Sequence, residues 1–383
     1  MDHAQHASDG SGHEFDTVVV GGGQAGLTIG FHLVRRLHRD ILILDAHARV
    51  GDAWRRRWDS LRLFTPAKYD GLPGMPFPGD PLAFPTKDEM ADYLEAYAAR
   101  FELPVLTGIR VDRVGRVDGR FVVEAGERSW IARNVVIAAG GHQVPRVPAF
   151  ADQLDASVQQ LHSEDYRNPS ELRAGPVLVV GLGNSGAEIA LEVSRSHATT
   201  LAGTPGGQLP FRHGRTLARF GLPLIRFAGV HVLNGGNPIG RRVLPKAAKS
   251  ATPLIRTRLA ELEAAGVARA GRVTGVERGM PVVDGRALDV ADVIWCTGYR
   301  DDLSWIDLPV FDEDGRLQQT RGVVRGGGTG LYVVGLDLMY AIVSATLPGM
   351  PRDAAYLARR MRRVDVPETA GVARSTSGVG VWG

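Results

Sequence analysis

Cysteine is nearly absent from this sequence. Its 383 residues include one, Cys296, in the apolar run VIWC at positions 293–296. A single cysteine excludes an intrachain disulfide and a Cys-x-x-Cys redox pair, so we expect a reducing, cytoplasmic environment. The 11 histidines show no metal-ligand spacing with a third ligand nearby. We therefore expect no metal site.

Long apolar runs and a recognisable leader are also lacking. No uncharged stretch approaches the ~20 residues that span a bilayer. The first 13 residues, MDHAQHASDGSGH, lack the cationic start and apolar stretch of a signal peptide. We expect residues 1–13 and 368–383 to be disordered ends. The chain between them is long enough for two domains.

Acidic residues are absent between Glu192 and Glu261, a stretch that holds 11 Lys and Arg residues. The rest of the chain has 34 basic and 42 acidic residues, so its basic character is local. Such a field suits a phosphate-bearing ligand, nucleic acid or an anionic membrane surface. Because no zinc-finger spacing or RNA-recognition signature is present, we expect no nucleic-acid partner. Membrane docking stays an alternative to a basic surface that serves a phosphate ligand.

Glycine is abundant, and it forms the pattern Gly-x-Gly-x-x-Gly twice. The first copy lies in DTVVVGGGQAGLTIGFHL (residues 16–33) and the second in VLVVGLGNSGAEIALEVS (residues 177–194). Each follows a β-branched apolar strand and opens a predicted helix. The three glycines provide a tight turn, close approach to pyrophosphate and close helix-to-strand packing. The helix N-terminus then points at the phosphates.

The two copies differ at the end of the next strand. In DILILDA (residues 40–46) the acid Asp45 follows Gly23 by 22 residues, near the ~20-residue spacing at which a carboxylate meets ribose hydroxyls. In ATTLAGT (residues 198–204) the strand ends at Thr204 without an acid. A hydroxyl there tolerates the 2′-phosphate of NADPH, so the end of this strand favours NADPH. Arg212 and Arg215 are candidate partners of that phosphate, or solvated surface residues. No arginine stands at the strand end itself, so NADH is an accepted alternative.

Two adjacent dinucleotide sites suggest that electrons pass between a nicotinamide and a flavin. Five further stretches resemble a known family: residues 50–78 (VGDAWRRRWDSLRLFTPAKYDGLPGMPFP), 84–105, 135–148 (VVIAAGGHQVPRVP), 293–305 (VIWCTGYRDDLSW) and 331–361. From about Phe15 to about Arg362 the sequence resembles the flavin-containing monooxygenases, which include plant indole-3-pyruvate monooxygenases and bacterial relatives.

The resemblance implies an α/β fold with two Rossmann-type dinucleotide-binding domains, each a parallel sheet flanked by helices. We expect a discontinuous FAD-binding domain at 14–170 and 290–362, and an NAD(P)H-binding domain with a basic helical excursion at 171–289. The predicted cofactor-binding residues are Gly21, Gly23, Gln24, Ala25, Gly26, Asp45, Ala46, Gly51, Trp54, Val111, Ala139, Gly140, Gly181, Gly183, Asn184, Ser185, Gly186, Thr204, Arg212, Thr297, Gly298 and Asp337.

The resemblance also implies an activity. NADPH would reduce FAD, and the reduced flavin would add O2 and form a C4a-hydroperoxide. One oxygen atom would then pass to a small substrate, a soft sulfur or nitrogen nucleophile or a carbonyl compound. Phe64 and Thr65 are predicted to line the reacting face of the flavin. Because many members of the family have an asparagine where this chain has Phe64, an NAD(P)H oxidase that releases hydrogen peroxide, or a flavin redox sensor, stays an alternative.

Other departures and details leave alternatives open. Ala139 replaces a threonine of the family, and in ASVQQLHSEDY (residues 156–166) the family's Phe and Gly are replaced. His162 is interpreted as a structural cap or a cofactor contact. Trp54 and Trp58 are predicted to stack on flavin or fill the core. Residues 55–57, three arginines, are predicted to be a solvated charge run, with contact to the FAD phosphates as the alternative. Residues 241–266 are predicted to be helical and amphipathic.

Overall fold

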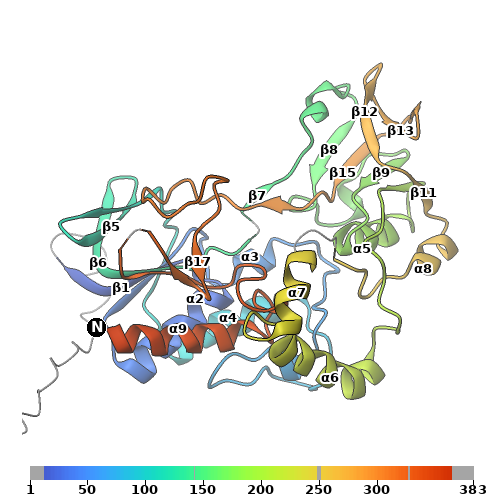
Figure 1. Ribbon diagram of the computed structural model, residues 1–383. Helices are drawn as coiled ribbons and strands as arrows, with labels where there is room; N and C mark the ends of the chain where they lie inside the picture. The colour runs from blue at the N-terminus through green and yellow to red at the C-terminus, as the bar shows by residue number, and fades with distance from the viewer. Residues whose placement is uncertain (1–12, 142, 248–251, 327, 365–383) are drawn as a thin grey trace, which may run out of the picture.

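The computed structural model describes residues 13–141, 143–247, 252–326 and 328–364. It contains two larger sheets at opposite ends of the molecule, joined by a narrow β-ribbon (Figure 1). The expected disordered ends lie outside the described residues, except His13, whose Nε2 lies 2.6 Å from Asp40 Oδ2.

The first sheet is built around the first glycine-rich turn. Its strand order is β17-β18-β19-β6-β1-β2-β3, and β4 and β5 extend it from β6. The strands from β19 to β3 are parallel neighbours, whereas β4, β5 and β6 form an antiparallel meander. The strands are β1 (Glu14–Val20), β2 (Ile41–Asp45), β3 (Val105–Thr107), β4 (Arg113–Val117), β5 (Arg120–Ala125), β6 (Arg128–Ile137), β17 (Gln319–Thr320), β18 (Val323–Val324) and β19 (Leu331–Val333).

Successive residues of β1 and β2 point to opposite faces of this sheet, and both faces are covered. On one face Val19 and Ile43 pack with α2 (Gln24–Phe31), α4 (Lys87–Arg100) and α9 (Met350–Val364). On the other, Val18 and Leu42 pack with side chains of the β4–β6 meander. A strand buried on both faces has to be apolar throughout, which explains the runs that mark β1 and β2 in the sequence. We call this sheet and its layers the first unit.

The second unit follows the same plan. Its five strands are all parallel, in the order β11-β10-β9-β15-β8. Helices α5 (Asn184–Val193) and α8 (Leu259–Ala264) cover one face, and a three-stranded antiparallel sheet, β12-β13-β14, covers the other. The strands are β8 (Gln159–His162), β9 (Val177–Val180), β10 (Thr199–Ala202), β11 (Ala268–Ala270), β12 (Val273–Glu277), β13 (Met280–Val283), β14 (Arg286–Ala287) and β15 (Asp292–Trp295).

The chain passes between the units twice, and the two passages pair with each other. Strand β7 (Val144–Pro145) runs antiparallel to β16 (Tyr299–Arg300) as a two-stranded ribbon. Strands β8 and β15 lie on the FAD side of the boundaries expected at 170/171 and 289/290, yet both pair within the second sheet. The strand pairing therefore assigns β8 and β15 to the second unit, outside the expected bounds. We propose that the chain passes from one domain to the other at the β7–β16 ribbon.

A helical excursion leaves the second unit after β10 and packs on the first unit. It comprises η5 (Leu217–Gly221), α6 (Leu222–Phe227), η6 (Ala228–Val232) and α7 (Pro238–Ala247), seen below the ribbon in Figure 1. Lys68 Nζ donates to the Ala218 carbonyl over 2.7 Å, and Gly235 N–H donates to the Tyr340 carbonyl over 2.7 Å. These contacts tie the excursion to two separate segments of the first unit.

The prediction of one helix over 241–266 is wrong for part of that range. Helix α7 ends at Ala247, α8 begins at Leu259, and residues 252–258 are not helical. Two local causes are visible. Pro253 has no N–H to donate within a helix, and the Asn184 side chain binds the backbone of Pro253 and Ile255. Residues 248–251 lie outside the described chain.

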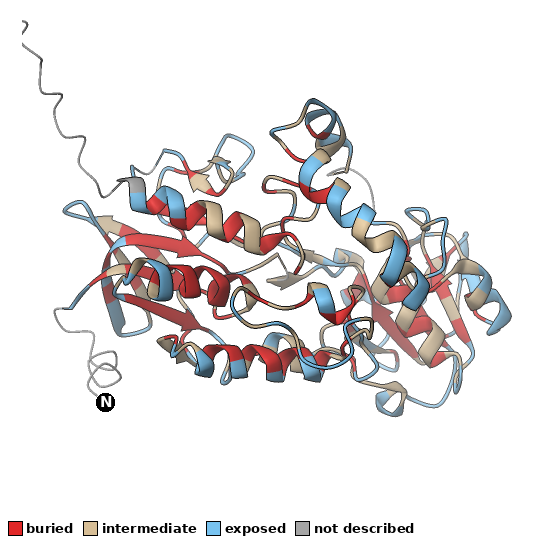
Figure 2. Ribbon diagram, turned by 90° about the horizontal axis from the view of Figure 1, so that it is seen from below, coloured by how far each residue is buried: buried red, intermediate tan, exposed pale blue. Residues whose placement is uncertain are grey.

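Short helical segments complete the described elements: η1 (His32–Arg36), α3 (Asp52–Arg55), η2 (Ala67–Tyr69), η3 (Ala149–Gln153) and η4 (Pro169–Glu171). Buried residues concentrate in the two sheets and in the inner faces of the helices that cover them (Figure 2). Among the described residues, no helix has the length and apolar character needed to cross a membrane.

Candidate functional site

The first glycine-rich turn joins β1 to α2, and sterics explain the first and the third of its glycines, Gly21 and Gly26. Gly21 has φ of 111°, and a Cβ there would lie 2.5 Å from the Ala138 carbonyl oxygen. A Cβ on Gly26 would lie 1.8 Å from the Gly21 carbonyl oxygen. Gly23 differs, since a Cβ on it would meet nothing within 4 Å. The space in front of the α2 N-terminus is therefore open, as a bound pyrophosphate requires.

The second turn, from β9 to α5, has the same geometry. Gly181 has φ of 115°, and its Cβ would lie 2.2 Å from the Cys296 carbonyl oxygen. A Cβ on Gly186 would lie 1.8 Å from the Gly181 carbonyl oxygen, whereas one on Gly183 would meet nothing within 4 Å. Both turns thus leave their helix N-termini accessible, and their free first-turn N–H groups fit a phosphate.

The ends of the next strands differ as the sequence indicates. Asp45 is buried at the end of β2, where its carboxylate accepts from Gly22 N–H and His47 N–H, both over 2.7 Å. Burial alone would raise the pKa of Asp45, but the hydrogen bonds from His47 and Gly22 outweigh it and lower the pKa. Asp45 is therefore an anion beside the first turn. Thr204, after β10, is exposed.

The first residue of each helix anchors a segment that borders the turn. Gln24 Oε1 of α2 accepts from Trp54 Nε1 over 3.3 Å. Asn184 of α5 donates from Nδ2 to the Pro253 carbonyl over 3.1 Å and accepts from Ile255 N–H over 2.8 Å. The Asn184 side chain is thus engaged with the protein, and its expected contact with nicotinamide phosphates stays a prediction, as does that of Ser185.

The segment expected to wrap the flavin is fixed by close packing. Gly51 has φ of 91°, and a Cβ there would lie 2.5 Å from the Ala91 carbonyl oxygen, so α4 excludes any larger residue. Trp58 is buried in the core of the second unit. The prediction of a solvated run at residues 55–57 is wrong for two of its arginines. Arg55 pairs with Asp52, Asp92 and Glu95, and Arg57 Nη1 donates to the Tyr299 hydroxyl over 2.5 Å.

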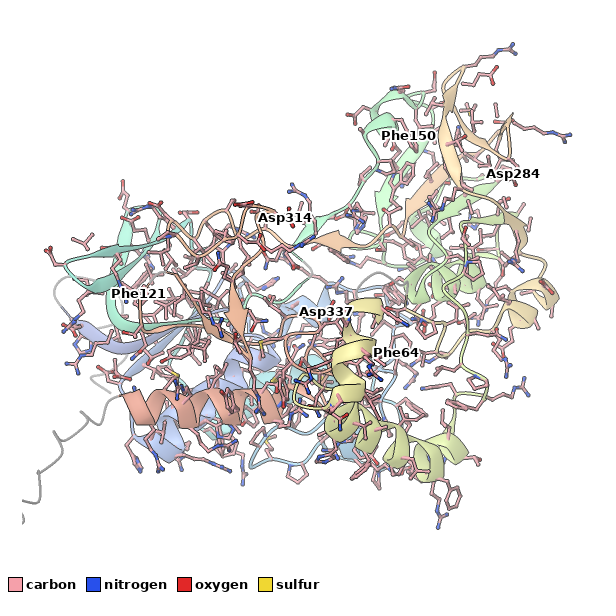
Figure 3. All side chains as sticks on the ribbon, viewed as in Figure 1. Phe64, Phe121, Phe150, Asp284, Asp314 and Asp337 are labelled. Atoms are coloured by element: carbon pink, nitrogen blue, oxygen red, sulfur yellow. The ribbon has the colours of Figure 1, made fainter. Side chains whose placement is uncertain are left out.

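Phe64 and Thr65 lie where residues of the second unit reach the first. Three successive carbonyls accept from that unit: Arg256 Nη2 donates to Arg62 O over 2.8 Å and to Leu63 O over 2.6 Å, and His213 Nε2 lies 2.7 Å from Phe64 O. The Arg256 guanidinium lies 5.2 Å from the centre of the Phe64 ring. Figure 3 labels Phe64 in this part of the molecule. The segment predicted to line the flavin face is therefore held by His213 and Arg256, which lie between the two passages of the chain.

Arg256 is itself held by an acid on the second dinucleotide helix. Its Nη1 lies 3.4 Å from Oε2 of Glu188, which stands in the second turn of α5 with a side chain that is 10% exposed. Burial raises the pKa of Glu188 to about 7, although Arg256 acts in the opposite direction. Burial also lowers the pKa of Arg256. The pair connects α5 with the Phe64 segment.

Thr65 contacts a second buried acid. Its hydroxyl donates to Asp70 Oδ1, and Asp70 is fully buried with no hydrogen-bond partner for Oδ2. Burial raises the pKa of Asp70 to about 7, against the lowering effect of the Thr65 hydrogen bond. Asp70 therefore carries a proton for much of the time at neutral pH, next to a residue predicted to line the flavin.

The crossover residues form the ribbon between the units. Gly140 and Gly298 have φ of 70° and 78°, in the left-handed region that glycine adopts readily. Arg146 N–H donates to Gly298 O over 2.9 Å, and the Thr297 hydroxyl donates to Arg146 O. Ala139 lies beside Gly21, as its backbone nitrogen is 3.1 Å from the Cβ position of that glycine. Ala139 thus borders the first turn, whereas Thr297 borders the second, since its backbone nitrogen is 3.4 Å from the Cβ position of Gly181.

His162 belongs to the same junction. Its Nε2 donates to the Gly298 carbonyl over 3.1 Å, its Nδ1 accepts from Glu164 N–H over 3.2 Å, and its ring meets that of Tyr299 edge-on at 5.0 Å. Both ring nitrogens are used within the protein. Burial, the largest cause, lowers the pKa of His162. The structural interpretation of His162 accounts for all of these contacts.

The remaining predicted residues lie around the two turns without a contact that tests their roles. Asp337 follows Gly335, whose Cβ position is 2.7 Å from the Cβ of Ala25 on α2, so the end of the last strand reaches the first turn. Burial, and then the nearby charge of Asp337, raise the pKa of Asp301. Ala46 is exposed and Val111 is half-buried. Arg212 is exposed, with Nη2 3.6 Å from Glu261 Oε1. Their cofactor contacts stay predictions.

Three residues of this region escaped the sequence analysis: Arg256, Glu188 and Asp70. Arg256 lies in a stretch that the sequence predicts as helix, and its partners are 68 to 194 positions away. Glu188 stands in an amphipathic helix where a charged residue is ordinary. Asp70 carried a usable signal, because it lies between apolar stretches of the wrapping segment. Within the described residues, no group of three or more His, Cys, Asp or Glu side chains gathers as metal ligands would.

Known proteins match this architecture. Residues 18–212 match the family described as Pyridine nucleotide-disulphide oxidoreductase. A CzcO-like oxidoreductase of Geobacillus kaustophilus, described as uncharacterized, is 37% identical over 350 residues, which cover 90% of this chain and 97% of the relative. The probable indole-3-pyruvate monooxygenase YUCCA3 of Arabidopsis thaliana is 28% identical over 358 residues, covering 83% of this chain and 81% of the relative.

Solved structures narrow the class further. The flavin-containing monooxygenase of Stenotrophomonas maltophilia superposes with a TM-score of 0.71 at 29% identity, over 92% of this chain and 99% of that chain. A double variant of flavin monooxygenase from the same organism gives a TM-score of 0.74 at 30% identity over the same shares. The chain is therefore a pyridine nucleotide-disulphide oxidoreductase by class and belongs to the flavin-containing monooxygenase family. The predicted family, the α/β fold class and the assignment as an oxidoreductase enzyme are confirmed.

Proposed function

We propose that this protein binds FAD at the first glycine-rich turn and NADPH at the second, and transfers one oxygen atom from O2 to a small substrate. The substrate class is a soft sulfur or nitrogen nucleophile or a carbonyl compound. The observation that carries the proposal is the pair of turns with matching geometry and open space at Gly23 and Gly183. The anionic Asp45 beside one turn and the exposed Thr204 beside the other support FAD at the first turn and NADPH at the second.

The protein's own residues would bind and orient the two cofactors. The first-turn N–H groups of α2 and α5 would hold the two pyrophosphates, and Asp45 would accept from ribose hydroxyls. Bound FAD would supply the two-electron and oxygen chemistry. Arg256 and His213 hold the carbonyls of residues 62–64, and so fix the Phe64 ring and the Thr65 hydroxyl in the region between the units.

The Phe64 ring is half-buried, offers no hydrogen-bond donor, and lies beside a guanidinium from the other unit. We infer that this ring would help to exclude water from the site once its ligands are bound. The names of relatives support oxygen transfer, since they include flavin-containing monooxygenases and indole-3-pyruvate monooxygenases.

Coupling between nicotinamide oxidation and substrate oxygenation tests the proposal. The holoenzyme is supplied with NADPH and ¹⁸O2, with and without a panel of sulfides, amines and ketones. We expect a product that carries one ¹⁸O atom and a matching fall in hydrogen peroxide for at least one substrate. Peroxide equal to the NADPH consumed with every substrate would instead support an oxidase. Reduction too slow for turnover with either nicotinamide would support a redox sensor.

A further inference from the structure

The helical excursion has one face on the protein and one face in solvent. Segments η5, α6 and η6 run without interruption from Leu217 to Val232. Ala218, Gly229 and Val230 are buried on the inner side. The carbonyl of Ala218 accepts from Lys68, and a Cβ on Gly229 would lie 2.8 Å from a Val343 side-chain carbon. The inner face is therefore fully used in packing on the first unit.

The outer face is apolar as well. Phe220 is 66% exposed, Leu224 72% and Phe227 60%. These residues are four and three positions apart, a spacing that places them on one side of a helix. Ile239 of the neighbouring α7 is also 54% exposed. We call these four residues the apolar stripe. Large side chains that are exposed together on one helix face mark a contact surface, since single scattered ones need no explanation.

The charged side chains that the helices of the excursion themselves carry have one sign. Arg219, Arg226, Arg241 and Arg242 are exposed on the same helices. No Asp or Glu occurs anywhere between Glu192 and Glu261. Arginine stems can lie along an apolar surface while their charged ends reach outward to an anionic layer. The combination of exposed Phe and Leu with flanking arginines is typical of helices that lie in the interface of an anionic bilayer.

A second copy of the chain fits this surface poorly. In a two-fold dimer the same patch meets itself, so the arginines of both copies would be brought into one interface. The helices supply no acid that could separate them. We therefore propose that the outer face of residues 217–242 docks on an anionic lipid bilayer, with the apolar stripe inserted among the acyl chains and the arginines at the headgroups.

This docking would set the candidate site beside the bilayer. Lys68, whose ammonium binds the excursion, lies four residues after Phe64, and the guanidinium of Arg226 lies 5.4 Å from the centre of the Tyr69 ring. The segment that lines the predicted flavin face is thus in direct contact with the docking helices. The proposal rests on the surface and not on oxygen transfer, so it can fail or hold independently of the proposed function.

Vesicle sedimentation with the holoenzyme tests the docking. Vesicles of phosphatidylcholine alone are compared with vesicles that also contain phosphatidylglycerol, at low and at moderate salt. We expect pelleting with the anionic vesicles only, and weaker pelleting as salt screens the arginines. Absence of pelleting at low salt, or equal pelleting with both vesicle types, would overturn the proposal.

Variants locate the surface. The triple change Phe220→Ser, Leu224→Ser and Phe227→Ser should weaken vesicle binding by at least about tenfold, because binding scales with the apolar area inserted. Val117→Ser is the matched control, since Val117 is 55% exposed on β4, far from the excursion in the fold. Arg219→Gln with Arg242→Gln should weaken binding about fivefold for each charge removed, whereas Arg278→Gln, at an exposed arginine of the second unit, should not.

Two readouts keep the outcome clear. Retained flavin absorbance and an unchanged melting temperature show that the triple variant is folded, and changing only Leu224→Ser provides a milder test if it is not. Sedimentation velocity without vesicles tests whether a second copy of the chain binds this surface instead. A dimer that the triple variant dissociates would overturn the membrane proposal and assign the apolar stripe to a second copy. NADPH oxidation without vesicles is measured separately, and its loss would bear only on the proposed function.

Discussion

The two glycine-rich turns are nearly identical in geometry and different in chemistry. Gly26 and Gly186 stand equally close to the carbonyl of the glycine five residues before, and Gly21 and Gly181 share a left-handed conformation. The strand that follows ends in the buried anion Asp45 in one unit, whereas in the other unit it ends at Ala202 and the exposed Thr204 comes two residues later. The comparison teaches that close packing determines the turn, whereas the charge after the next strand is the feature on which we base our proposal of which dinucleotide fits.

Positions within the two helices continue the comparison. The first residues, Gln24 and Asn184, each use an amide side chain to anchor a bordering segment. One turn further, Thr28 of α2 donates to the helix carbonyl of Gln24, whereas Glu188 of α5 approaches Arg256. The second helix is therefore the one that reaches the other unit.

The largest expected effect comes from filling the tight positions. Gly26→Ala or Gly186→Ala places a methyl group against a backbone carbonyl, and should destabilise its unit by about 3 kcal/mol. Gly23→Ala and Gly183→Ala are the matched controls, because their φ of −75° and −95° suits any residue and nothing lies within 4 Å of the Cβ. The controls should keep the melting temperature and bind FAD or NADPH less tightly. Thermal unfolding of all four variants distinguishes the two classes, and equal unfolding would contradict the steric account.

Removing the charge at the end of β2 should have the next largest effect. Asp45→Asn keeps the shape but replaces an anion that can accept from ribose hydroxyls, and should weaken FAD binding about 10- to 100-fold. The fraction of flavin retained through purification, and a titration of the stripped protein with FAD, measure it. Asp40→Asn at an exposed position before the same strand is the control. Full flavin retention in Asp45→Asn would show that the first turn does not use this carboxylate.

Neutralising Glu188 should change the pH dependence of stability. With its pKa raised to about 7, the folded protein keeps a proton that the unfolded chain releases above its ordinary pKa of 4.5. Its stabilising contribution is therefore complete below the ordinary pKa and is lost as pH rises through 7. As pH rises from about 5 to about 8, the free energy of unfolding of Glu188→Gln should increase by about 1 to 2 kcal/mol relative to that of the unmodified protein. Melting temperatures measured across this pH range test the prediction, and Glu263→Gln, at an exposed position of α8, is the control. The same pH dependence in Glu188→Gln and in the unmodified protein would contradict it.

The smallest expected effect is on nucleotide preference. Thr204→Asp places a carboxylate two residues beyond the end of β10, next to Gly203, which the strand register matches with Asp45. It should lower kcat/KM for NADPH about fivefold while leaving NADH little changed, because the new charge is exposed. Thr204→Asn is the neutral control. Steady-state kinetics with both nucleotides measures the ratio. An unchanged ratio would place the 2′-phosphate elsewhere, for example nearer Arg212.

Several parts of the fold could be predicted because their signals are local. A β-branched run, three glycines and a helix within eighteen residues identified both turns, and the Thr-Gly-Tyr stretch at 297–299 marked a crossover. The family resemblance then supplied the order of the two units. Gly51 was found in the same way, and its packing against Ala91 explains why glycine is required there.

Other features depend on contacts between distant segments, which one sequence does not show. The excursion reads as basic and amphipathic, but its packing on residues near Tyr340 follows from the folded chain alone. The pairing of β8 and β15 in the second sheet is of this kind too. Arg256 meets Glu188 and two carbonyls of the wrapping segment only because the chain returns after the excursion. Such clusters have no fixed spacing.

Rapid mixing tests the central claim. This claim is that the two turns hold a flavin and a nicotinamide, and that the nicotinamide reduces the flavin before oxygen is transferred. The holoenzyme is reduced anaerobically with NADPH or NADH and then mixed with O2, and the flavin spectrum is followed. We predict rapid loss of oxidised-flavin absorbance with NADPH, then reoxidation through a resolved intermediate phase that an oxidisable substrate shortens. Direct return to oxidised flavin with one hydrogen peroxide per NADPH, whatever the substrate, would contradict the account.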